Sequence, residues 1–259
     1  MSALNTPDLV VTAGDDHVTT IELNRPPENY LDEDLVRQIA DVLESVEHDL
    51  DVRAVVLVSA GKHFCAGAKL SPNADDLPTG DTNPLYDQVV RLFAGTVPIV
   101  AAVQGAAVGA GLGLALAADF RVAAPEARFA ATFAKLGFHQ GFGLSTTLPR
   151  AVGSQLALEM LYTGRRISGD DSVRLGLCDR LVPAAELRSA AHALALEIAE
   201  SAPLAVRAIR RTMRGSLFAE VGAATRLEHS EQQPLRLTAD YREGVQATAE
   251  RRPPVFTGR

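Results

Sequence analysis

Residues 99–118 carry no formal charge, and this stretch constrains the fold of the chain more than any other feature of the sequence. A stretch of this length could cross a bilayer as a helix. However, most of its residues are Ala or Gly, Gln104 lies inside it, and Asp119 and Arg121 follow almost at once. A buried strand at 99–103, a glycine-rich loop and a buried helix explain this composition better than a membrane span does.

The first third of the chain alternates strand and helix patterns. Residues 17–23 nearly alternate between polar and apolar side chains, as in a half-buried strand. Apolar residues recur every third or fourth position across 31–50, and acidic residues lie in the first turn of the helix that this spacing predicts. Residues 54–58 are all apolar, which is typical of a strand covered on both faces.

The middle of the chain shifts from strands to helices. Short strands are predicted at 120–122 and 129–131. A short helix is predicted within 168–176, because Ser168 is a good N-cap and the segment ends in a glycine. Residues 184–199 are rich in Ala, Leu and Glu, which favour a helix.

The C-terminal part reads as helices alone. Helical patterns fill residues 203–250, with breaks near Gly215 and Pro234. Alternating strands and helices followed by helices indicate an α/β body with a helical extension. We therefore predict a core over residues 1–200 and a helical C-terminal region over 201–259.

The charge of the chain argues against a nucleic-acid partner. Its formal net charge is -7, whereas nucleic-acid binding normally demands a basic patch. Four arginines do gather at helical spacing, at positions 207, 210, 211 and 214. We interpret them as the solvated face of a helix rather than as a site for a polyanion.

The cysteines and the N-terminal residues indicate the cellular compartment in which the protein is expected. Cys65 and Cys178 give no disulfide framework and suit a reducing cytoplasm. The first residues show no basic segment followed by an apolar one, so no signal peptide is evident. A cytoplasmic protein is the expectation.

Two segments of small residues, 61–70 and 105–113, each follow a strongly apolar strand. Small residues let backbone N–H groups approach a ligand closely. The second segment opens a helix, whose first N–H groups have no partner within the helix and attract negative charge. Side by side, the two segments could form a hole for an oxyanion. Tight turns and close packing alone would explain the same spacing.

A dinucleotide site is the other obvious reading of the glycines. Gly109, Gly111 and Gly113 give G-x-G-x-G, but the dinucleotide fingerprint is G-x-G-x-x-G, and Leu114 holds its last position. No acidic residue closes a second strand at the expected distance. We therefore reject a nucleotide cofactor.

The order of motifs along the chain resembles the crotonase (enoyl-CoA hydratase/isomerase) family. Residues 63–68 are similar to its F-x-A-G-[AG] motif, and residues 99–113 to its I-A-A-V-x-G-x-A-x-G-G-G segment. The resemblance covers nearly the whole chain in order, with further matches at 24–31, 148–153, 161–183 and 243–256.

This resemblance implies a β-β-α spiral core with C-terminal helices that build trimers, often paired into hexamers. It also implies an acyl-CoA thioester whose carbonyl accepts hydrogen bonds from two backbone N–H groups, here those of Ala68 and Ala110. Coenzyme A would be part of the substrate, and no metal or separate cofactor is expected.

The resemblance also assigns residues to coenzyme A and the acyl group. Ala66 and Gly67 would lie against the adenine end, and Lys69 would contact a phosphate or face water. The remaining positions expected along the ligand are Pro27, Glu28, Tyr30, Leu70, Gly109, Gly113 and Phe133.

The positions that carry acids in the family are not acidic here. The two glutamates of the hydratases map to Gly113 and Phe133, and the acid of some isomerases maps to Gly141. Hydration needs a base for water and an acid for the α-carbon, so ordinary hydratase activity is not expected. His139 could transfer a proton or could only hydrogen-bond its own loop. The prediction is an acyl-CoA enzyme with an unassigned reaction. A non-catalytic acyl-CoA binder and a hydrolase assisted by His139 stay open.

Overall fold

The computed structural model describes residues 5–69 and 82–259. Its main sheet has six strands in the order β1-β2-β3-β4-β6-β9, where β1 pairs antiparallel with β2 and the other pairs are parallel. The strands are β1 (Leu9–Ala13), β2 (Val18–Leu23), β3 (Ala54–Ser59), β4 (Ile99–Val103), β6 (Phe120–Ala123) and β9 (Arg180–Leu181).

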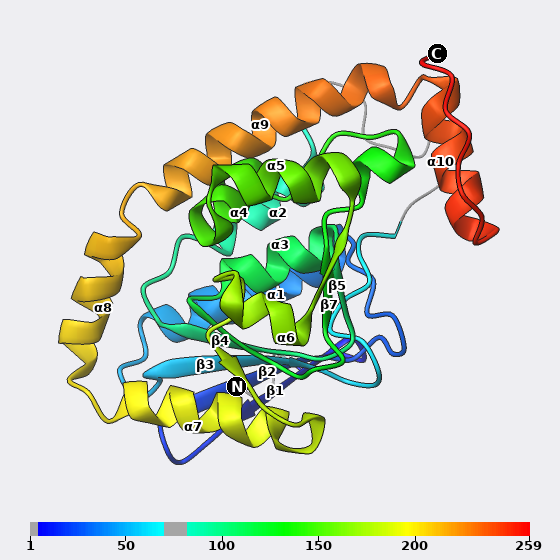
Figure 1. The fold of residues 1–259 in the computed structure, drawn as a ribbon. Coiled ribbons are helices and arrows are strands. Elements are labelled where there is room, and N and C mark those ends of the chain that lie inside the picture. The colour runs from blue at the N-terminus through cyan, green and yellow to red at the C-terminus, as the bar shows by residue number, and fades with distance from the viewer. Residues whose placement is uncertain (1–4, 70–81) are drawn as a thin grey trace.

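Helices cover both faces of this sheet (Figure 1). Every residue of β3 and β4 is buried, as their continuous apolar sequences predict. Val56 and Val100 pack on one side against α7 (Leu187–Ala199). Alternate residues such as Leu57 and Ala101 face the larger core under α1 (Glu33–Glu47) and α3 (Ala110–Ala117). The α/β class is thereby confirmed.

A second, three-stranded sheet has the order β5-β7-β8. Its strands are β5 (Ala106–Val108), β7 (Arg128–Ala130) and β8 (Arg166–Ser168). The chain passes from β4 through β5 to α3, and then from β6 through β7 to the 3-10 helix η3 (Phe133–Leu136). These successive units make the β-β-α spiral that was predicted. Segment 105–113 is therefore not only a loop, and Phe133 begins a 3-10 helix rather than lying on a strand.

The helices predicted within 168–176 and 203–250 are confirmed, whereas those at 84–91, 144–152 and 154–163 were not predicted. Ser168 caps its helix by accepting a hydrogen bond from the N–H of Asp171, and α8 and α9 are separated at Gly215. The second break comes just after Pro234, since α9 continues to Leu235. No helix within the described ranges is long and apolar enough to cross a membrane. The helices not yet introduced are α2 (Pro84–Arg91), α4 (Leu144–Val152), α5 (Ser154–Thr163), α6 (Gly169–Arg174), η4 (Ala184–Glu186), α8 (Pro203–Met213), α9 (Leu217–Leu235) and α10 (Ala239–Ala249).

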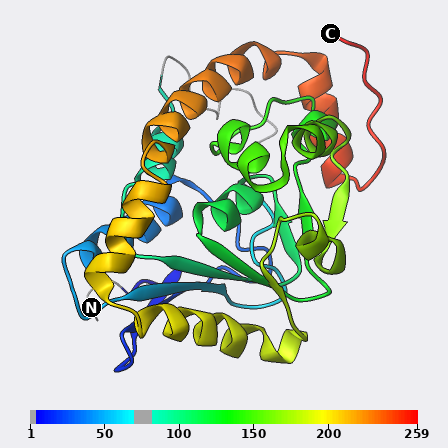
Figure 2. The same ribbon diagram turned by 60° about the vertical axis from the view of Figure 1, so that its left-hand side comes forward.

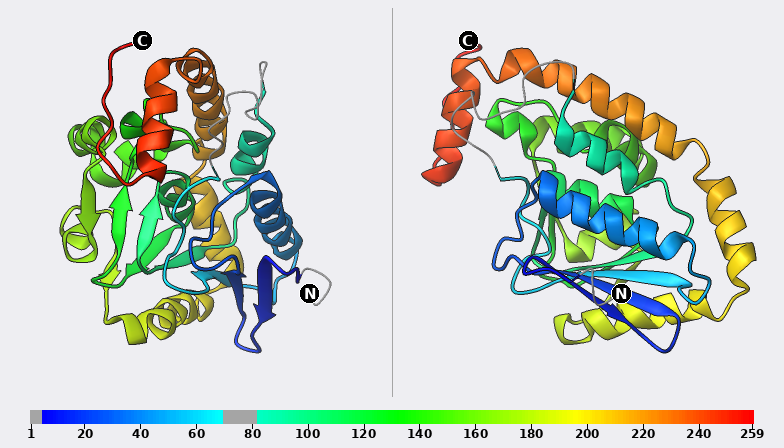
Figure 3. Two further views of the ribbon diagram at one scale, coloured as in Figure 1. Left: turned by 90° about the vertical axis from the view of Figure 1, so that its right-hand side faces the viewer. Right: turned by 180° about the vertical axis from the view of Figure 1, so that it is seen from behind.

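The C-terminal helices wrap around the core. Figure 2 shows α8 running along one side of the molecule, from α7 beneath the sheet to α9 above it. Figure 3 shows α9 lying across α2. Because α9 packs on α2, α4 and the loop before α4, it helps to form the wall of the cavity described below.

The interpretation of the arginines of α8 as a solvated face is wrong for two of them. Arg207 and Arg210 are each only 7% exposed. Arg207 donates to the carbonyls of Asp49 and Val52 just beyond α1, and Arg214 donates to the carbonyl of Ala117 at the end of α3. Helix C-terminal carbonyls attract positive charge, so these guanidinium groups bind α8 to the core and turn its apolar residues outward.

Asp119 is the centre of this attachment. Its carboxylate accepts hydrogen bonds from Arg210 Nε at 2.8 Å and from the N–H of Ile99 at 2.8 Å, and it pairs with Arg214. Burial alone would raise the pKa of Asp119, but the charges of Arg210 and Arg214 outweigh it and hold the pKa below its ordinary value. This stabilisation is present above the ordinary pKa and is lost as the pH falls through the folded-state pKa.

We expect Asp119→Ala to lower the free energy of unfolding by about 3–5 kcal/mol, because buried guanidinium groups would lose their counter-charge. Asp170→Ala, on the exposed first turn of α6, should change it by about 0.5 kcal/mol or less. Urea unfolding of both variants at one protein concentration measures the difference. A shift below about 1 kcal/mol for Asp119→Ala would show that the cluster does not hold α8 in place.

Candidate active site

The two segments of small residues lie side by side. The N–H of Cys65 donates to the carbonyl of Ala106 at 2.9 Å, and the N–H of Val108 donates back to the carbonyl of Cys65 at 3.1 Å. A Cβ at Gly111 would lie 2.1 Å from the carbonyl oxygen of Cys65. Only glycine permits this approach, so the start of α3 is held against segment 65–68.

The backbone N–H of Ala68 points away from the neighbouring segment around Leu31. Leu31 donates to the carbonyl of Gly67 at 2.9 Å and accepts from the N–H of Lys69 at 3.0 Å. In a parallel bridge of this kind, the residue between the two bonded ones uses neither its N–H nor its C=O toward the partner. The N–H of Ala68 therefore points to the side opposite Leu31.

Ala110 is the first residue of α3, where a helix leaves its N–H groups without an internal partner. Gly109, with φ +55°, turns the chain into the helix and donates to the carbonyl of Ala130 at 2.9 Å. Within the described part of the chain, neither Ala68 nor Ala110 donates its N–H to a backbone carbonyl. Two polar donors are thus left for a ligand.

Ala68 and Ala110 both line one cavity of about 290 Å³. Its wall contains seven of the predicted site residues, namely Ala66, Gly67, Ala68, Lys69, Gly109, Ala110 and Phe133. The cavity wall also contains residues that were not predicted, among them Asn83, Tyr86, Phe142, Gln232 and Arg236.

Other predicted ligand positions lie beside this cavity rather than in its wall. Ala66 donates to the carbonyl of Glu28 at 2.8 Å, which ties segment 27–30 to the cavity mouth. Pro27 and Tyr30 are exposed, Tyr30 to 43%. Leu70 lies outside the described residues. Contact of these positions with coenzyme A stays a prediction.

The space at each acid position of the family is filled by an aromatic residue. A Cβ at Gly113 would lie 2.5 Å from Cδ1 of Phe142, and one at Gly141 would lie 1.9 Å from the hydroxyl of Tyr86. At the third position, the ring of Phe133 itself lines the cavity and reaches to within 3.6 Å of the Cβ position of Gly109. The cavity wall is therefore apolar where a hydratase needs carboxylates.

His139 is not among the residues that line the cavity. Its Nδ1 lies 2.8 Å from the carbonyl oxygen of Gln140, and its own carbonyl accepts a hydrogen bond from Gln232 Nε2 at 3.1 Å. Nothing in this geometry aims the ring at a substrate. It supports the structural role for His139, and a role in proton transfer stays a prediction.

Sequence reasoning missed Tyr86 and Gln232. The Tyr86 hydroxyl donates to Gln232 Oε1 at 3.0 Å and accepts from Gln232 Nε2 at 2.8 Å. Burial, followed by the charge of Glu228, raises the pKa of Tyr86 far above its ordinary value, so the phenol stays protonated. The pair Asn83-Pro84, an N-cap followed by proline at the first helical position, was the signal that could have located α2.

Glu228 is a second buried polar residue whose role the sequence did not indicate. Both of its oxygens accept hydrogen bonds at 2.8 Å, from the N–H groups of Gly143 and Ser145. Burial raises the pKa of this carboxyl. Glu228 lies on α9 and caps α4, so it fixes the loop that places Phe142 in the cavity wall.

Cys65 lies within segment 61–70 and is not a nucleophile. Its side chain is buried, and burial raises its pKa to about 12. The thiolate is the reactive form of cysteine. Cys65 is therefore a small packing residue.

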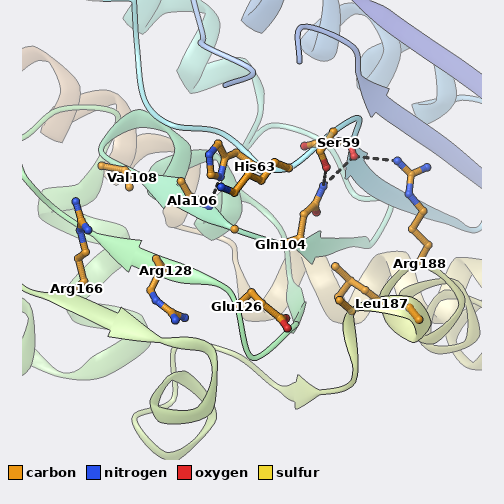
Figure 4. Close-up of a pocket in the computed structure, with 15 residues that line it drawn as sticks. Ser59, His63, Gln104, Ala106, Val108, Glu126, Arg128, Arg166, Leu187 and Arg188 are labelled. Atoms are coloured by element: carbon orange, nitrogen blue, oxygen red, sulfur yellow. Dashed lines mark hydrogen bonds between the residues drawn. The ribbon is translucent and has the colours of Figure 1, made fainter. Parts of the chain in front are cut away.

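A larger cavity of about 790 Å³ lies on the outer face of the small sheet (Figure 4). Arg128 and Arg166 line it together with Lys62 and Glu126. The Nδ1 of His63 accepts a hydrogen bond from the N–H of Ala106 at 3.1 Å, at its inner edge. Neither Ala68 nor Ala110 lines this cavity. We therefore place the candidate active site in the smaller cavity, where the free N–H groups are.

Comparison with known proteins gives one consistent result. A family model described as enoyl-CoA hydratase/isomerase matches residues 14–259. The chain is 37% identical to the probable enoyl-CoA hydratase EchA12 of Mycobacterium tuberculosis, over 93% of this chain and 89% of that protein. It is 35% identical to (E)-benzylidenesuccinyl-CoA hydratase of Thauera aromatica, over 93% and 96% of the two chains. A crystal structure of an enoyl-CoA hydratase/isomerase from Pseudoalteromonas atlantica superposes with a TM-score of 0.86 at 31% identity, over 96% of this chain and 100% of the other.

Proposed function

Because the chain belongs to the enoyl-CoA hydratase/isomerase family, we propose that it binds an acyl-CoA and stabilises the enolate of its thioester. The observation that supports this proposal is that Ala68 and Ala110 line one cavity while neither donates its N–H to a backbone carbonyl among the described residues. Such donors act on the charge that develops on a carbonyl oxygen during reaction. Alanine in place of glycine keeps the N–H, so this departure from the family pattern leaves the hole intact.

Several features support an acyl group at this place. The N-terminus of α3 carries partial positive charge toward the cavity, and every residue of this helix is buried and uncharged. Val108, Phe133 and Phe142 supply an apolar wall. Lys69, exposed at the cavity mouth, suits a phosphate of coenzyme A. Coenzyme A is then part of the substrate, and the buried free thiols suit the reducing cytoplasm.

A non-catalytic acyl-CoA-binding protein is the second candidate. Gly113 and Gly141 are packed against aromatic side chains, and His139 does not line the cavity. Such a protein would keep the pocket and the two N–H donors but would lack side chains that act as a general acid or base. Chemistry, if present, would need a proton donor or acceptor other than the family's glutamates.

Mass spectrometry of a panel of acyl-CoAs, incubated with the protein in D₂O, tests the proposal. Turnover or exchange of α-protons for deuterium is the result expected of an enolate-forming enzyme. Binding without turnover or exchange would favour the second candidate, and absence of binding would overturn both. His139→Ala with retained binding and lost turnover would assign His139 a proton-transfer role.

We also propose that the protein assembles as a trimer or a pair of trimers through residues 201–259. Since Arg207 and Arg210 of α8 face the core, several of its apolar residues face outward. Leu204, Ile209 and Met213 are 65%, 62% and 76% exposed. Large apolar side chains exposed in this number on one helix are typical of an interaction surface.

Light scattering at micromolar concentration should therefore report a trimer or hexamer. Met213→Glu should shift the population toward monomer, because it places a charge in the proposed apolar interface. A parent protein that is monomeric at this concentration would contradict the proposal.

A further inference from the structure

The acyl cavity ends at Tyr86, and another cavity begins behind this side chain. The other cavity measures about 300 Å³ and lies between α2 and α9. Among the described residues, only Asn83 and Tyr86 line both cavities. The Tyr86 ring is thus the wall between them.

This wall is fixed in place. Tyr86 is 9% exposed, and its hydroxyl is bonded to both polar atoms of the Gln232 amide. Gln232 Nε2 also donates to the carbonyls of His139 and Gln140, at 3.1 Å each. The tip of the ring meets the chain at Gly141, where a Cβ would lie 1.9 Å from the hydroxyl. The tyrosine therefore joins α2, α9 and the loop before α4, and it does not swing aside freely.

The space behind the wall offers apolar surface to an aliphatic chain through Val90, Phe218 and Gly222. Polar side chains line the rest of it, among them Asp87, Arg91, Thr225 and Arg226. The ring of His229 stands edge-on to Tyr86 at a centroid distance of 6.3 Å. These residues would cover the distal part of an acyl chain that continued in a straight line past the position of the tyrosine ring.

We propose that Tyr86 sets the maximum length of the acyl group. The cavity between α2 and α9 is the space that a longer aliphatic chain enters when this side chain is shortened. The inference rests on the proposed function, since it needs an acyl group in the first cavity. It goes beyond that function because it names the residue that selects the substrate.

The test is the affinity for acetyl-, butyryl-, octanoyl- and dodecanoyl-CoA, measured by calorimetry on the parent and on Tyr86→Ala. The parent should prefer the short acyl groups. Each methylene that leaves water for the opened space strengthens binding about fourfold. The ratio of octanoyl-CoA to butyryl-CoA affinity should therefore rise at least about tenfold in Tyr86→Ala.

Matched variants distinguish the effect of losing the Tyr86 ring from the effect of losing its hydroxyl and from the effect of losing a tyrosine elsewhere. Tyr86→Phe keeps the ring and should keep the parent's preference for short chains. Tyr162→Ala makes the same change on α5, at a residue that is 74% exposed and lines neither cavity. This variant should also keep the parent's preference for short acyl chains. Tyr86→Leu, which leaves more of the core filled, replaces Tyr86→Ala if circular dichroism shows that the alanine variant is unfolded.

The outcomes distinguish this inference from the proposed function. A parent that binds no acyl-CoA overturns the proposed function and the inference together. A parent that binds short and long chains equally, or folded Tyr86→Ala and Tyr86→Leu variants that keep the parent's preference, overturns the inference alone.

Discussion

Crotonyl-CoA incubated with the purified protein should keep its enoyl-thioester absorbance over times in which an ordinary hydratase consumes it. Hydration needs a base that activates water and an acid that protonates the α-carbon. The resemblance to the family maps these two groups to Gly113 and Phe133, which carry no titratable group. The loss of each acid–base group removes a factor of about 10²–10⁴ in rate, so the two losses together leave little activity.

The structure adds that one substitution will not restore the activity. Gly113→Glu would place its Cβ 2.5 Å from Cδ1 of Phe142, a ring that is 1% exposed. The new side chain must displace this ring before it can reach the cavity. We therefore expect Gly113→Glu to lower stability without hydratase activity. An authentic hydratase in the same assay is the positive control, and loss of absorbance at ordinary hydratase rates with the parent protein would refute the prediction.

Ala110→Pro should abolish most of any turnover found with the acyl-CoA panel while it leaves the fold intact. Proline is well tolerated at the first position of a helix, where its fixed φ suits the helix and its missing N–H is not needed. Ala110 holds this position in α3. The substitution therefore removes the donor and changes no charge.

Removing one oxyanion donor typically costs about 10²–10³ in turnover. A bound ground-state thioester loses the roughly 0.5–1.5 kcal/mol of one net hydrogen bond, and the proline Cδ, which replaces the amide hydrogen, also crowds its oxygen. Turnover and affinity should therefore both fall. For a non-catalytic binder, the same variant should weaken acyl-CoA binding by at least the loss of one hydrogen bond.

Ser154→Pro is the matched control for this variant. Ser154 is the first residue of α5 and follows a glycine N-cap with positive φ, as Ala110 does, and it is exposed and outside the cavity. Circular dichroism and thermal melting should show both proline variants folded. If folded Ala110→Pro binds and turns over acyl-CoA like the parent, the thioester oxygen does not lie at the N-terminus of α3.

The sequence by itself predicted the fold, and its resemblance to the family assigned the two backbone donors to Ala68 and Ala110. Continuous apolar runs at 54–58 and 99–103 predicted strands covered on both faces, and both strands form the centre of the main sheet. The free N–H of Ala110 follows from a local property, the start of a helix, whereas that of Ala68 depends on pairing with the distant Leu31. The motifs that resemble the family predicted where the candidate site lies along the chain.

Only the tertiary structure decided what surrounds these donors. The sequence shows that Gly113 and Gly141 are not acidic, but Phe142 and Tyr86 fill the vacated space from other elements. The helical spacing of the α8 arginines likewise identified a common face, but not its direction. Arg207 and Arg210 face inward because carbonyl groups beyond α1 and the carboxylate of Asp119 lie opposite them. Contacts between segments distant along the chain set the shape and polarity of the pocket, and such contacts leave no periodic signal in the sequence.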